Sequence, residues 1–533
     1  MEEIKMNKTF KKVLCGVLCV CAASGALAGC GGGDDFQVNM DIDLTQKIDL
    51  NVLMPNSGET IEAMRADSTV AVVEEVTGYH VNYSQLASAN ADSTLSNNLI
   101  NRSEYHLVKM TTAQFGGLVQ QGALLPLNDV LDKFGPAIKS AISDESWDVV
   151  TVNGKIYGIP ERASSDNVEH PIVMRQDWLD KLNLSMPTDA ASFKSTLQAF
   201  KTANSEGKLT ANGSVMSDFV PFTFDNMQSL VYPISASFGI YSEWQEYEVN
   251  GQTKVLHYMQ APNYDDYVEY MADLMDEGLV DASFTTQDNA TAMSKFNGGK
   301  SGAIATSIWT MTAVVSGLQS NGIISANEAA GTLENTLCYV RSLDGGYTGK
   351  FYRSGGYTYV TAIPHYMAEN AGYAIDWVNS KLTDTDDNHN FRDIVIGKES
   401  EGTWTYNDTN GYIPTDKFSS KEHSDWFLTG SNENVYTTYW KARVRKNAEL
   451  FRAWEELMDG ADEYGVYNVV DFIPPIYEYS ACAKLVADDA LAAFQEMVYT
   501  NRSAANLSAH LAKFVENGGE SATDAINAWY ASK

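Results

Sequence analysis

Short apolar runs alternate with longer amphipathic stretches along most of the chain. Runs typical of β-strands occupy residues 47–55, 104–110, 153–160, 301–308 and 358–364. Apolar positions recur at helical spacing over residues 114–135, 174–184, 188–204, 264–278, 369–382 and from about 474 to the end, with a break at Gly518 and Gly519. Thr188 or Asp189 is expected to cap the helix over 188–204. Strands that alternate with helices over this length predict α/β layers with largely parallel sheets.

The N-terminal apolar run has a different character. Residues 13–26 are apolar or small and follow three lysines, and the run is shorter than the roughly 20 residues that span a bilayer. The run closes on GALAGCGGGDD (25–35), in which Leu27-Ala28-Gly29-Cys30 resembles a bacterial lipobox. This resemblance implies cleavage before Cys30 and lipid attachment to its thiol, since two acyl chains anchor a protein stably. The alternative is an ordinary cleaved signal in which Cys30 has no special role.

Charge limits the partners of this chain. The 533 residues carry a formal net charge of −32, and removal of residues 1–29 leaves the mature chain slightly more negative. Such an acidic protein is not expected to bind nucleic acid or anionic membrane surfaces, because both are polyanions. No later apolar run is long enough to span a membrane, so we expect the only membrane contact through Cys30.

Cysteine and histidine usage gives no sign of a metal or a cofactor. Three of the six cysteines lie in the signal and Cys30 takes the lipid, which leaves Cys338 and Cys482 as one bridge or, as we expect, two separate thiols. The eight histidines form no metal-binding motif. The loop at 384–390 begins like a calcium loop but lacks its glycine and its glutamate, so we interpret it as a solvated loop.

Several motifs in order carry a family resemblance from about residue 104 onward. The chain resembles the extracellular solute-binding proteins of ABC importers, family 1, in the large lipoprotein branch common in Gram-positive bacteria. The matching segments are EYHLVKM (104–110), NGKIYGIP (153–160), IVMRQDWLDKLNLSMPTD (172–189), KFNGGKSGAIATSIWT (295–310), IGKESEGTWTYNDTNGYIP (396–414) and KFVENGGESATDAINAWY (513–530).

The resemblance implies a type II periplasmic-binding-protein-like fold, in which two α/β lobes are joined by a multi-strand hinge and C-terminal helices follow. Crossings between the lobes are expected near Ile159–Arg162, Lys350–Gly356 and Tyr412–Thr415. The implied divisions are a signal peptide at 1–29, a flexible tether at 30–45, a first lobe at 46–160 with 357–412, and a second lobe at 161–356 with 413–533.

The function that the resemblance implies is solute capture for import. We expect a monomer at the extracellular face of the cell membrane that binds an oligosaccharide between its lobes and delivers it to ABC permease subunits. A surface glycoside hydrolase is the main alternative, although no GxSxG, P-loop or zinc motif is present. A binding protein for a peptide or another polar solute is the third possibility. We expect a binding protein and not an enzyme.

Sugars stack on aromatic rings and hydrogen-bond to charged side chains, so residues of both types are candidate ligand contacts. Trp309 follows the strand at 301–308, and the resemblance implies a tryptophan that stacks on sugar at this place. The alternative is that Trp309 belongs to the hydrophobic core. Trp244 follows a turn that is similar to cleft loops, whereas Trp147 and Trp404 lie in polar loops.

Three residues near the expected crossings complete the set of candidates. Glu161 and Arg162 follow Pro160, so they either recognise hydroxyl groups or form a surface ion pair. Tyr357 follows Gly355-Gly356, which are expected at a hinge or turn, and its role is either ligand contact or structural.

Overall fold

A computed structural model describes residues 36–533, apart from 57, 59, 66–67, 88–89, 210–214, 326–332, 419–422 and 424. Within them, Val38–Lys533 forms one compact unit. The signal peptide, Cys30 and the start of the tether therefore lie outside the described residues. Within the described part, no helix has the length and apolar character needed to cross a membrane.

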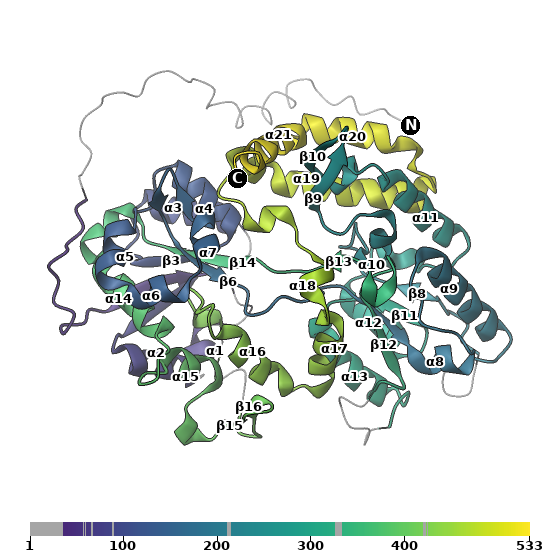
Figure 1. Ribbon diagram of the computed structural model, residues 1–533, viewed down its shortest axis with the longest axis horizontal. Helices are drawn as coiled ribbons and strands as arrows, with labels where there is room; N and C mark the ends of the chain where they lie inside the picture. Colours follow the sequence, from purple (N-terminus) through teal and green to yellow (C-terminus); the bar gives the residue numbers. More distant parts are fainter. Residues whose placement is uncertain are drawn as a thin grey trace, which may run out of the picture. The chain divides into compact units, whose positions relative to one another are not determined.

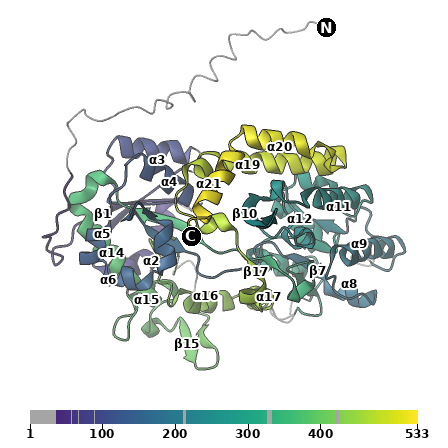
Figure 2. The same cartoon turned by 45° about the horizontal axis from the view of Figure 1, so that its top comes forward.

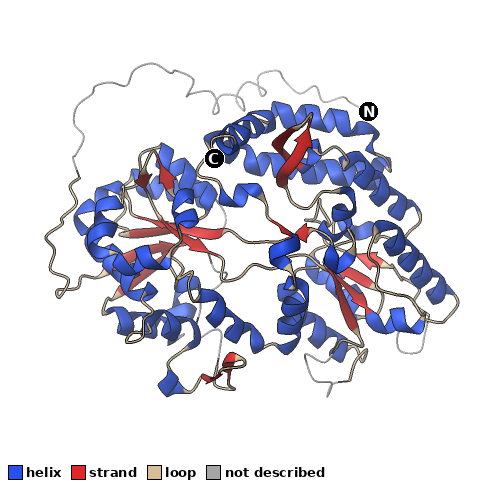
Figure 3. Cartoon of the chain, viewed as in Figure 1, coloured by secondary structure: helices blue, strands red, loops and turns tan. Residues whose placement is uncertain are grey.

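The first lobe is built on a five-stranded sheet of mixed direction (Figures 1 and 3). Strands β2 (Val81–Gln85) and β3 (Leu107–Met110) lie on either side of β1 (Leu50–Met54) and run parallel to it. Strand β14 (Tyr357–Ala362) runs antiparallel to its neighbours β3 and β6 (Ile159–Arg162). The prediction of largely parallel sheets is therefore only partly right, because β14 enters this sheet after the chain has returned from the second lobe. The strand order is β2 (Val81–Gln85), β1 (Leu50–Met54), β3 (Leu107–Met110), β14 (Tyr357–Ala362) and β6 (Ile159–Arg162).

The second lobe contains a four-stranded sheet whose central strands run antiparallel to each other. The predicted helix over 174–184 begins too early, since Ile172–Arg175 is strand β7 and the helix α8 covers Gln176–Lys181. Ile172 and Met174 enter one hydrophobic core and Val173 enters the other, so β7 is buried on both faces and has no polar alternation. The strand order is β12 (Leu337–Val340), β7, β11 (Ala303–Ala305) and β8 (Phe222–Thr223).

Helices cover both faces of each sheet (Figures 1 and 3). In the first lobe these are α1 (Ile61–Arg65), α2 (Ser68–Thr77), α3 (Ala91–Ile100), α4 (Thr112–Gln120), α5 (Asn128–Phe134), α6 (Pro136–Ala141), α7 (Asp144–Val149), α14 (Ala371–Leu382) and α15 (Asn390–Ile396). In the second lobe they are α8, α9 (Ala190–Ser205), α10 (Tyr232–Ser235), α11 (Tyr264–Asp276), α12 (Asn289–Asn297), α13 (Met311–Ser320) and α17 (Ala448–Met458).

Small paired strands and two connecting helices complete the lobes. The paired strands are β4 (Thr151–Val152) with β5 (Lys155–Ile156), β9 (Trp244–Val249) with β10 (Gln252–His257), β13 (Phe351–Tyr352) with β17 (Gly465–Val466), and β15 (Trp404–Asn407) with β16 (Gly411–Pro414). The connecting helices are α16 (Tyr436–Arg445) and α18 (Ala461–Tyr464).

The C-terminal helices lie over the second lobe and also reach the first (Figure 2). They are α19 (Tyr477–Gln495), α20 (Leu507–Glu516) and α21 (Gly519–Tyr530), and the predicted break before the last helix is confirmed, since Gly518 has a left-handed φ of 97°. Helix α19 also packs against α4 of the first lobe. A Cβ atom on Gly116 of α4 would lie 3.2 Å from both Pro475 Cβ and Ser480 Oγ, so glycine at this position favours the close approach of the two segments.

Helix boundaries that the sequence marks with capping residues agree with the structure. The side chain of Asp189 accepts a hydrogen bond from the backbone N–H of Ser192 and caps α9, as predicted. Helices α11 and α14 begin within two residues of their predicted starts at 264 and 369. The cap at Asp189 located α9, and the helical spacing of apolar residues located α11 and α14, without any tertiary information.

Candidate functional site

Two adjacent strands carry the chain between the lobes. The backbone N–H of Ser354 donates to the carbonyl of Asn167 at 2.8 Å, and the N–H of Asn167 donates to the carbonyl of Ser354 at 3.0 Å. The N–H of Ala163 donates to the carbonyl of Gly356 at 2.9 Å. These crossings follow β6 and precede β14, close to the predicted positions, and their pairing forms a two-stranded hinge.

The last crossing lies later in the chain than Tyr412–Thr415. Two buried lysines of the first lobe hold the segment 426–429: Lys109 Nζ donates to the carbonyl of Leu428 at 2.7 Å, and Lys381 Nζ donates to Thr429 Oγ1 at 2.7 Å. Burial lowers the pKa of Lys381 well below its ordinary value. The boundary predicted at residue 413 is therefore too early, and the chain leaves the first lobe only in α16, because segment 426–429 is tied to it by these bonds.

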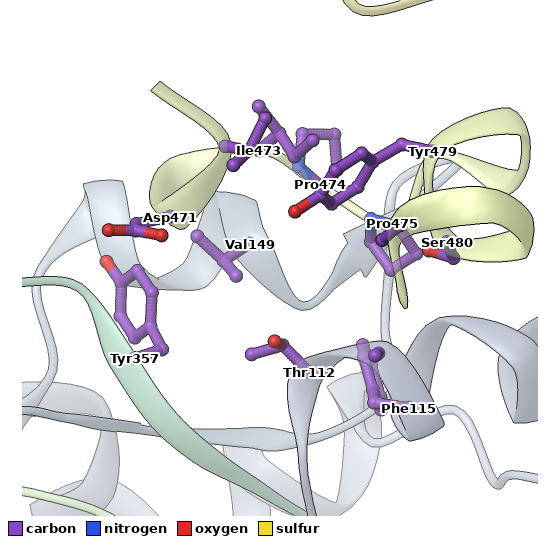
Figure 4. Close-up of a pocket in the computed structure, with 13 residues that line it drawn as sticks. Thr112, Phe115, Val149, Tyr357, Asp471, Ile473, Pro474, Pro475, Tyr479 and Ser480 are labelled. Atoms are coloured by element: carbon purple, nitrogen blue, oxygen red, sulfur yellow. The ribbon is translucent and has the colours of Figure 1, made fainter. Parts of the chain in front are cut away.

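One cavity of about 130 Å³ lies where the first lobe meets the segment that leads into α19 (Figure 4). Thr112 begins α4 immediately after β3, so this cavity opens at the carboxyl end of a parallel strand, where ligands of α/β sheets bind. Asp471 and Tyr479 face it from the other side, and Tyr357 faces it from β14. The hydroxyl group of Tyr357 donates to Ser146 Oγ at 2.9 Å.

A second cavity, of about 230 Å³, lies in the second lobe and has an acidic lining. Glu169, which precedes β7, and Glu243, which precedes β9, both line it together with Tyr232. The ring of Tyr232 stacks on Tyr352 with centroids 4.2 Å apart. Aromatic faces beside carboxylates are the two kinds of group that a sugar requires.

The two cavities are electrostatically linked through Asp471. Burial, together with the negative charges of Glu243 and Glu169, raises the pKa of Asp471 to about 7, against a hydrogen bond from Asn468 that lowers it. The amide of Asn468 donates to Asp471 Oδ1 at 3.0 Å. Three carboxylates thus act on one another across this part of the molecule.

A third cavity, of about 370 Å³, lies beside the hinge and is mostly polar. Arg162 and residues 163–166 of the first crossing line it, opposite Ser143 and Glu433. Arg162 NH1 lies 3.7 Å from Glu145, an exposed carboxylate that holds it only loosely. The guanidinium group therefore remains available to a polar ligand.

The structure places the tryptophans that were predicted as ligand contacts in different environments. Trp309 follows β11 and is 44% exposed, and its ring meets Trp440 of α16 edge to face at 5.6 Å. Trp244 is only 1% exposed and packs against His257 and Tyr479, so the prediction of a ligand contact there is wrong. Strand β9 begins at Trp244 and points this ring into the core of the second lobe.

Trp147 and Trp404 are partly buried and line none of the cavities described above. Trp147 packs against the core of the first lobe from α7. Trp404 donates through Nε1 to the carbonyl of Gly397 at 2.8 Å and lies 4.8 Å from the ring of Tyr412. Both rings are thus occupied by local packing.

Glu161 and Arg162 are adjacent but face different environments. Glu161 is buried and pairs with Lys109 at 2.8 Å, so it is part of the interior of the first lobe and neither a surface ion pair nor a direct ligand contact. Arg162, by contrast, lines the third cavity, and Tyr357 lines the first. The structure thus leaves Trp309, Arg162 and Tyr357 as accessible candidates.

Sequence reasoning missed the residues that gather in the first two cavities. Glu169, Glu243, Asp471 and Tyr479 come from four separate segments, and no local pattern distinguishes them from the other acidic and tyrosine residues. Proximity to the first crossing was a usable signal only for Glu169. These four residues come close together only through the tertiary structure.

The described residues offer no metal site or disulfide. No group of three or more His, Cys, Asp or Glu side chains among them is placed to hold a metal ion. Cys338 and Cys482 are both buried free thiols, which agrees with the expectation of two separate cysteines. Burial raises the pKa of Cys338 to about 12, so this thiol is not reactive.

Comparison with known proteins places the chain among solute-binding proteins. Residues 69–351 match the family model described as bacterial extracellular solute-binding protein. The fructooligosaccharide ABC transporter substrate-binding protein FusA of Streptococcus pneumoniae is 24% identical over 318 residues, which are 56% of this chain and 58% of FusA. Lipoprotein LipO of Bacillus subtilis is 26% identical over 48% of each chain. The chain thus spans about half the length of these two relatives.

Solved structures share the fold over most of the chain. FusA in complex with kestose superposes with a TM-score of 0.64 at 15% identity and covers 91% of this chain and 99% of its own. An HMO-binding solute-binding protein from Bifidobacterium longum infantis gives a TM-score of 0.64 at 16% identity and covers 91% of this chain and 98% of its own. These likenesses confirm the predicted two-lobe fold.

Proposed function

Because the chain belongs to the bacterial extracellular solute-binding protein family, we propose that it captures an oligosaccharide between its two lobes and delivers it to the permease of an ABC importer. The observation that carries this proposal is the group formed by Tyr357, Asp471 and Tyr479 at the carboxyl end of a parallel strand. Tyrosine rings can stack on sugar faces, and carboxylates accept hydrogen bonds from hydroxyl groups. The carbohydrate ligands named for FusA and for the Bifidobacterium protein support the same ligand class.

The hinge provides the motion that capture requires. Two paired strands and α16 connect the lobes, and a hinge of this kind allows closure over a bound solute. Closure would bring the first cavity, which faces the first lobe, toward the acidic cavity of the second lobe. A ligand of several sugar units would then contact both lobes, which is why we propose an oligosaccharide.

The same proposal includes a lipid anchor at Cys30. The lipobox-like sequence before Cys30 supports it, as does the similarity to a protein named lipoprotein LipO. A lipid-anchored monomer at the outer face of the cell membrane would keep captured solute close to the permease. The acidic residues Asp34 and Asp35 and the glycines before them would serve as the tether.

Calorimetry on the mature protein with a panel of oligosaccharides, chosen after a thermal-shift screen, tests the capture of sugar. We expect Tyr479→Ala to weaken binding of the identified ligand about five- to thirtyfold, since a stacked ring contributes on the order of 1–2 kcal/mol. Tyr406→Ala is the matched control, because Tyr406 is 58% exposed on the β15–β16 hairpin and lines none of the cavities described. Equal affinities of the two variants would contradict the proposed site.

One observation favours a second function. A glycoside hydrolase needs two carboxylates, one of which has a raised pKa, and Asp471 has a raised pKa to which the charge of Glu243 contributes. Mass spectrometry of the ligand after prolonged incubation with the protein separates the two functions. We expect intact oligosaccharide, and multiple turnovers of cleavage would assign the protein to the enzymes.

A further inference from the structure

The cavity of the second lobe contains one buried hydrogen-bond acceptor that lacks a donor among the described residues. Gln228 is 7% exposed and lines this cavity. Its amide nitrogen donates to the carbonyl of Ala305 at 3.2 Å, which fixes the amide, and its Oε1 has no partner among the described residues. An acceptor that is desolvated without a donor is unfavourable, so this oxygen is suited to a ligand that donates.

The charges around the same cavity are unbalanced. Glu169 and Glu243 line it, and none of the described lining residues is lysine or arginine. Two histidines are present here: His170 lines the cavity, and His257 Nε2 lies 3.5 Å from Glu243 Oε1 while its Nδ1 accepts the N–H of Met259. The negative field acts on Asp471 as well, because both glutamates raise the pKa of Asp471.

Two cations in this region already form ion pairs with other carboxylates. Asp488 at the rim of the cavity pairs with Lys484 at 2.8 Å, and Arg353 pairs with Asp166 at 2.7 Å. Neither cation compensates Glu169 or Glu243 through any ion pair found in the described residues. The cavity therefore combines excess negative charge with an acceptor that lacks a donor, which disfavours an anionic ligand and favours a cationic donor.

We propose that this acidic cavity, defined by Glu169, Gln228 and Glu243, binds the protonated amine of an amine-bearing saccharide. An ammonium group supplies three donors and a positive charge, which match the free acceptor of Gln228 and the two carboxylates. The ring of Tyr232 beside them adds a face that attracts cations. A metal ion fits less well, since no metal-binding group of side chains was found in the described part of the chain. This inference rests on the proposed function and specifies its substrate class.

Calorimetry with three matched tetrasaccharides tests the inference on the mature, wild-type protein. The probes are the glucosamine tetramer, which carries free amines, the N-acetylglucosamine tetramer, in which they are blocked, and the galacturonate tetramer, which is anionic. We expect the glucosamine tetramer to bind at least tenfold more tightly than the acetylated one, and the galacturonate tetramer not to bind. The preference should shrink several-fold between 50 mM and 500 mM NaCl, because salt screens charge.

Variants connect this preference to the cavity. Glu243→Gln and Glu169→Gln should each weaken the glucosamine tetramer at least tenfold and change the affinity for the acetylated tetramer less than threefold. Glu248→Gln removes an equal charge from the exposed part of strand β9 and should leave all affinities unchanged. Circular dichroism and melting temperatures establish that each variant is folded.

Several outcomes would overturn the inference. Equal or tighter binding of the acetylated tetramer would do so, as would a glucosamine affinity that neither Glu variant changes. Binding of Ca²⁺ alone that disappears in Glu243→Gln would assign the cavity to a metal. Binding of neutral oligosaccharides without any preference for amines would remove the inference and leave sugar capture intact, whereas failure of every saccharide in the panel would contradict sugar capture itself.

Discussion

Replacement of Trp309 by alanine gives the sharpest test of where the solute stacks. The ring is 44% exposed at the end of β11, with its edge against Trp440. A tryptophan side chain presents about 250 Å², so roughly 110 Å² of Trp309 is open to a ligand. Because a sugar covers about two thirds of this area, burial at about 25 cal/mol per Å² corresponds to roughly 2 kcal/mol, or about 30-fold in affinity.

The stability of the Trp309→Ala protein distinguishes a platform from a core residue. Loss of the edge-to-face contact with Trp440 should cost about 1 kcal/mol, which lowers the melting temperature by only a few degrees. A core tryptophan would instead cost about 3–5 kcal/mol. Trp309→Phe keeps an aromatic face and should retain most of the affinity, which separates stacking from a general loss of structure.

The assay is calorimetry with the best ligand of the oligosaccharide panel, alongside a melting curve for each variant. Trp529→Ala is the matched control, because Trp529 packs on the core of the second lobe from α21 and lines none of the cavities described. A folded Trp309→Ala protein with wild-type affinity would refute the platform and the reasoning from strand ends that located it.

Further predictions concern the anchor, the titration of one carboxyl group and one buried ion pair. Cys30→Ser should release the protein from the membrane fraction, and full retention would contradict the lipid anchor. Since the folded pKa of Asp471 is raised to about 7, folding loses stability as pH rises from about 4 to 7. Asp471→Asn should therefore raise the melting temperature by a few degrees at pH 8 (about 2 kcal/mol after allowance for solvent screening) and not at pH 4; equal curves at both pH values would contradict this. Glu161→Gln should cost about 3–5 kcal/mol in urea denaturation, because Lys109 would keep a buried charge without its partner. The exposed Glu145→Gln should cost less than about 0.5 kcal/mol, and similar losses in both variants would contradict the buried pair.

Local patterns and family resemblance allowed the fold to be predicted further than the site. The cap at Asp189 and the glycine break at 518 located helix ends correctly, because these depend on nearby residues only. Strand β7 was mistaken for the start of a helix, since burial on both of its faces removes the alternation that marks a strand. Trp244 was predicted to contact the ligand but is buried, because whether a ring faces a cleft or the core depends on segments distant in sequence.

The acidic side chains of the site were beyond prediction for the same reason. Glu243 and Asp471 are separated by more than two hundred residues and act on each other only in the folded protein. With 69 acidic residues in the chain, sequence alone gives no basis to choose these. Arg162 and Tyr357 could be selected because each lies at a predicted crossing between the lobes, Arg162 at the end of β6 and Tyr357 at the start of β14.

The absence of a side chain at Gly116 has a consequence for engineering. This glycine lets α4 of one lobe touch Pro475, which precedes α19, and Ser480, which lies in α19. Gly116 itself lines neither of the first two cavities. A methyl or larger group there would act as a wedge between the two segments and would shift the balance between open and closed forms, and it would also press on two residues that line the first cavity. Residue 116 is therefore a natural tuning position for a fluorescent biosensor built on this scaffold, whose dynamic range depends on that balance.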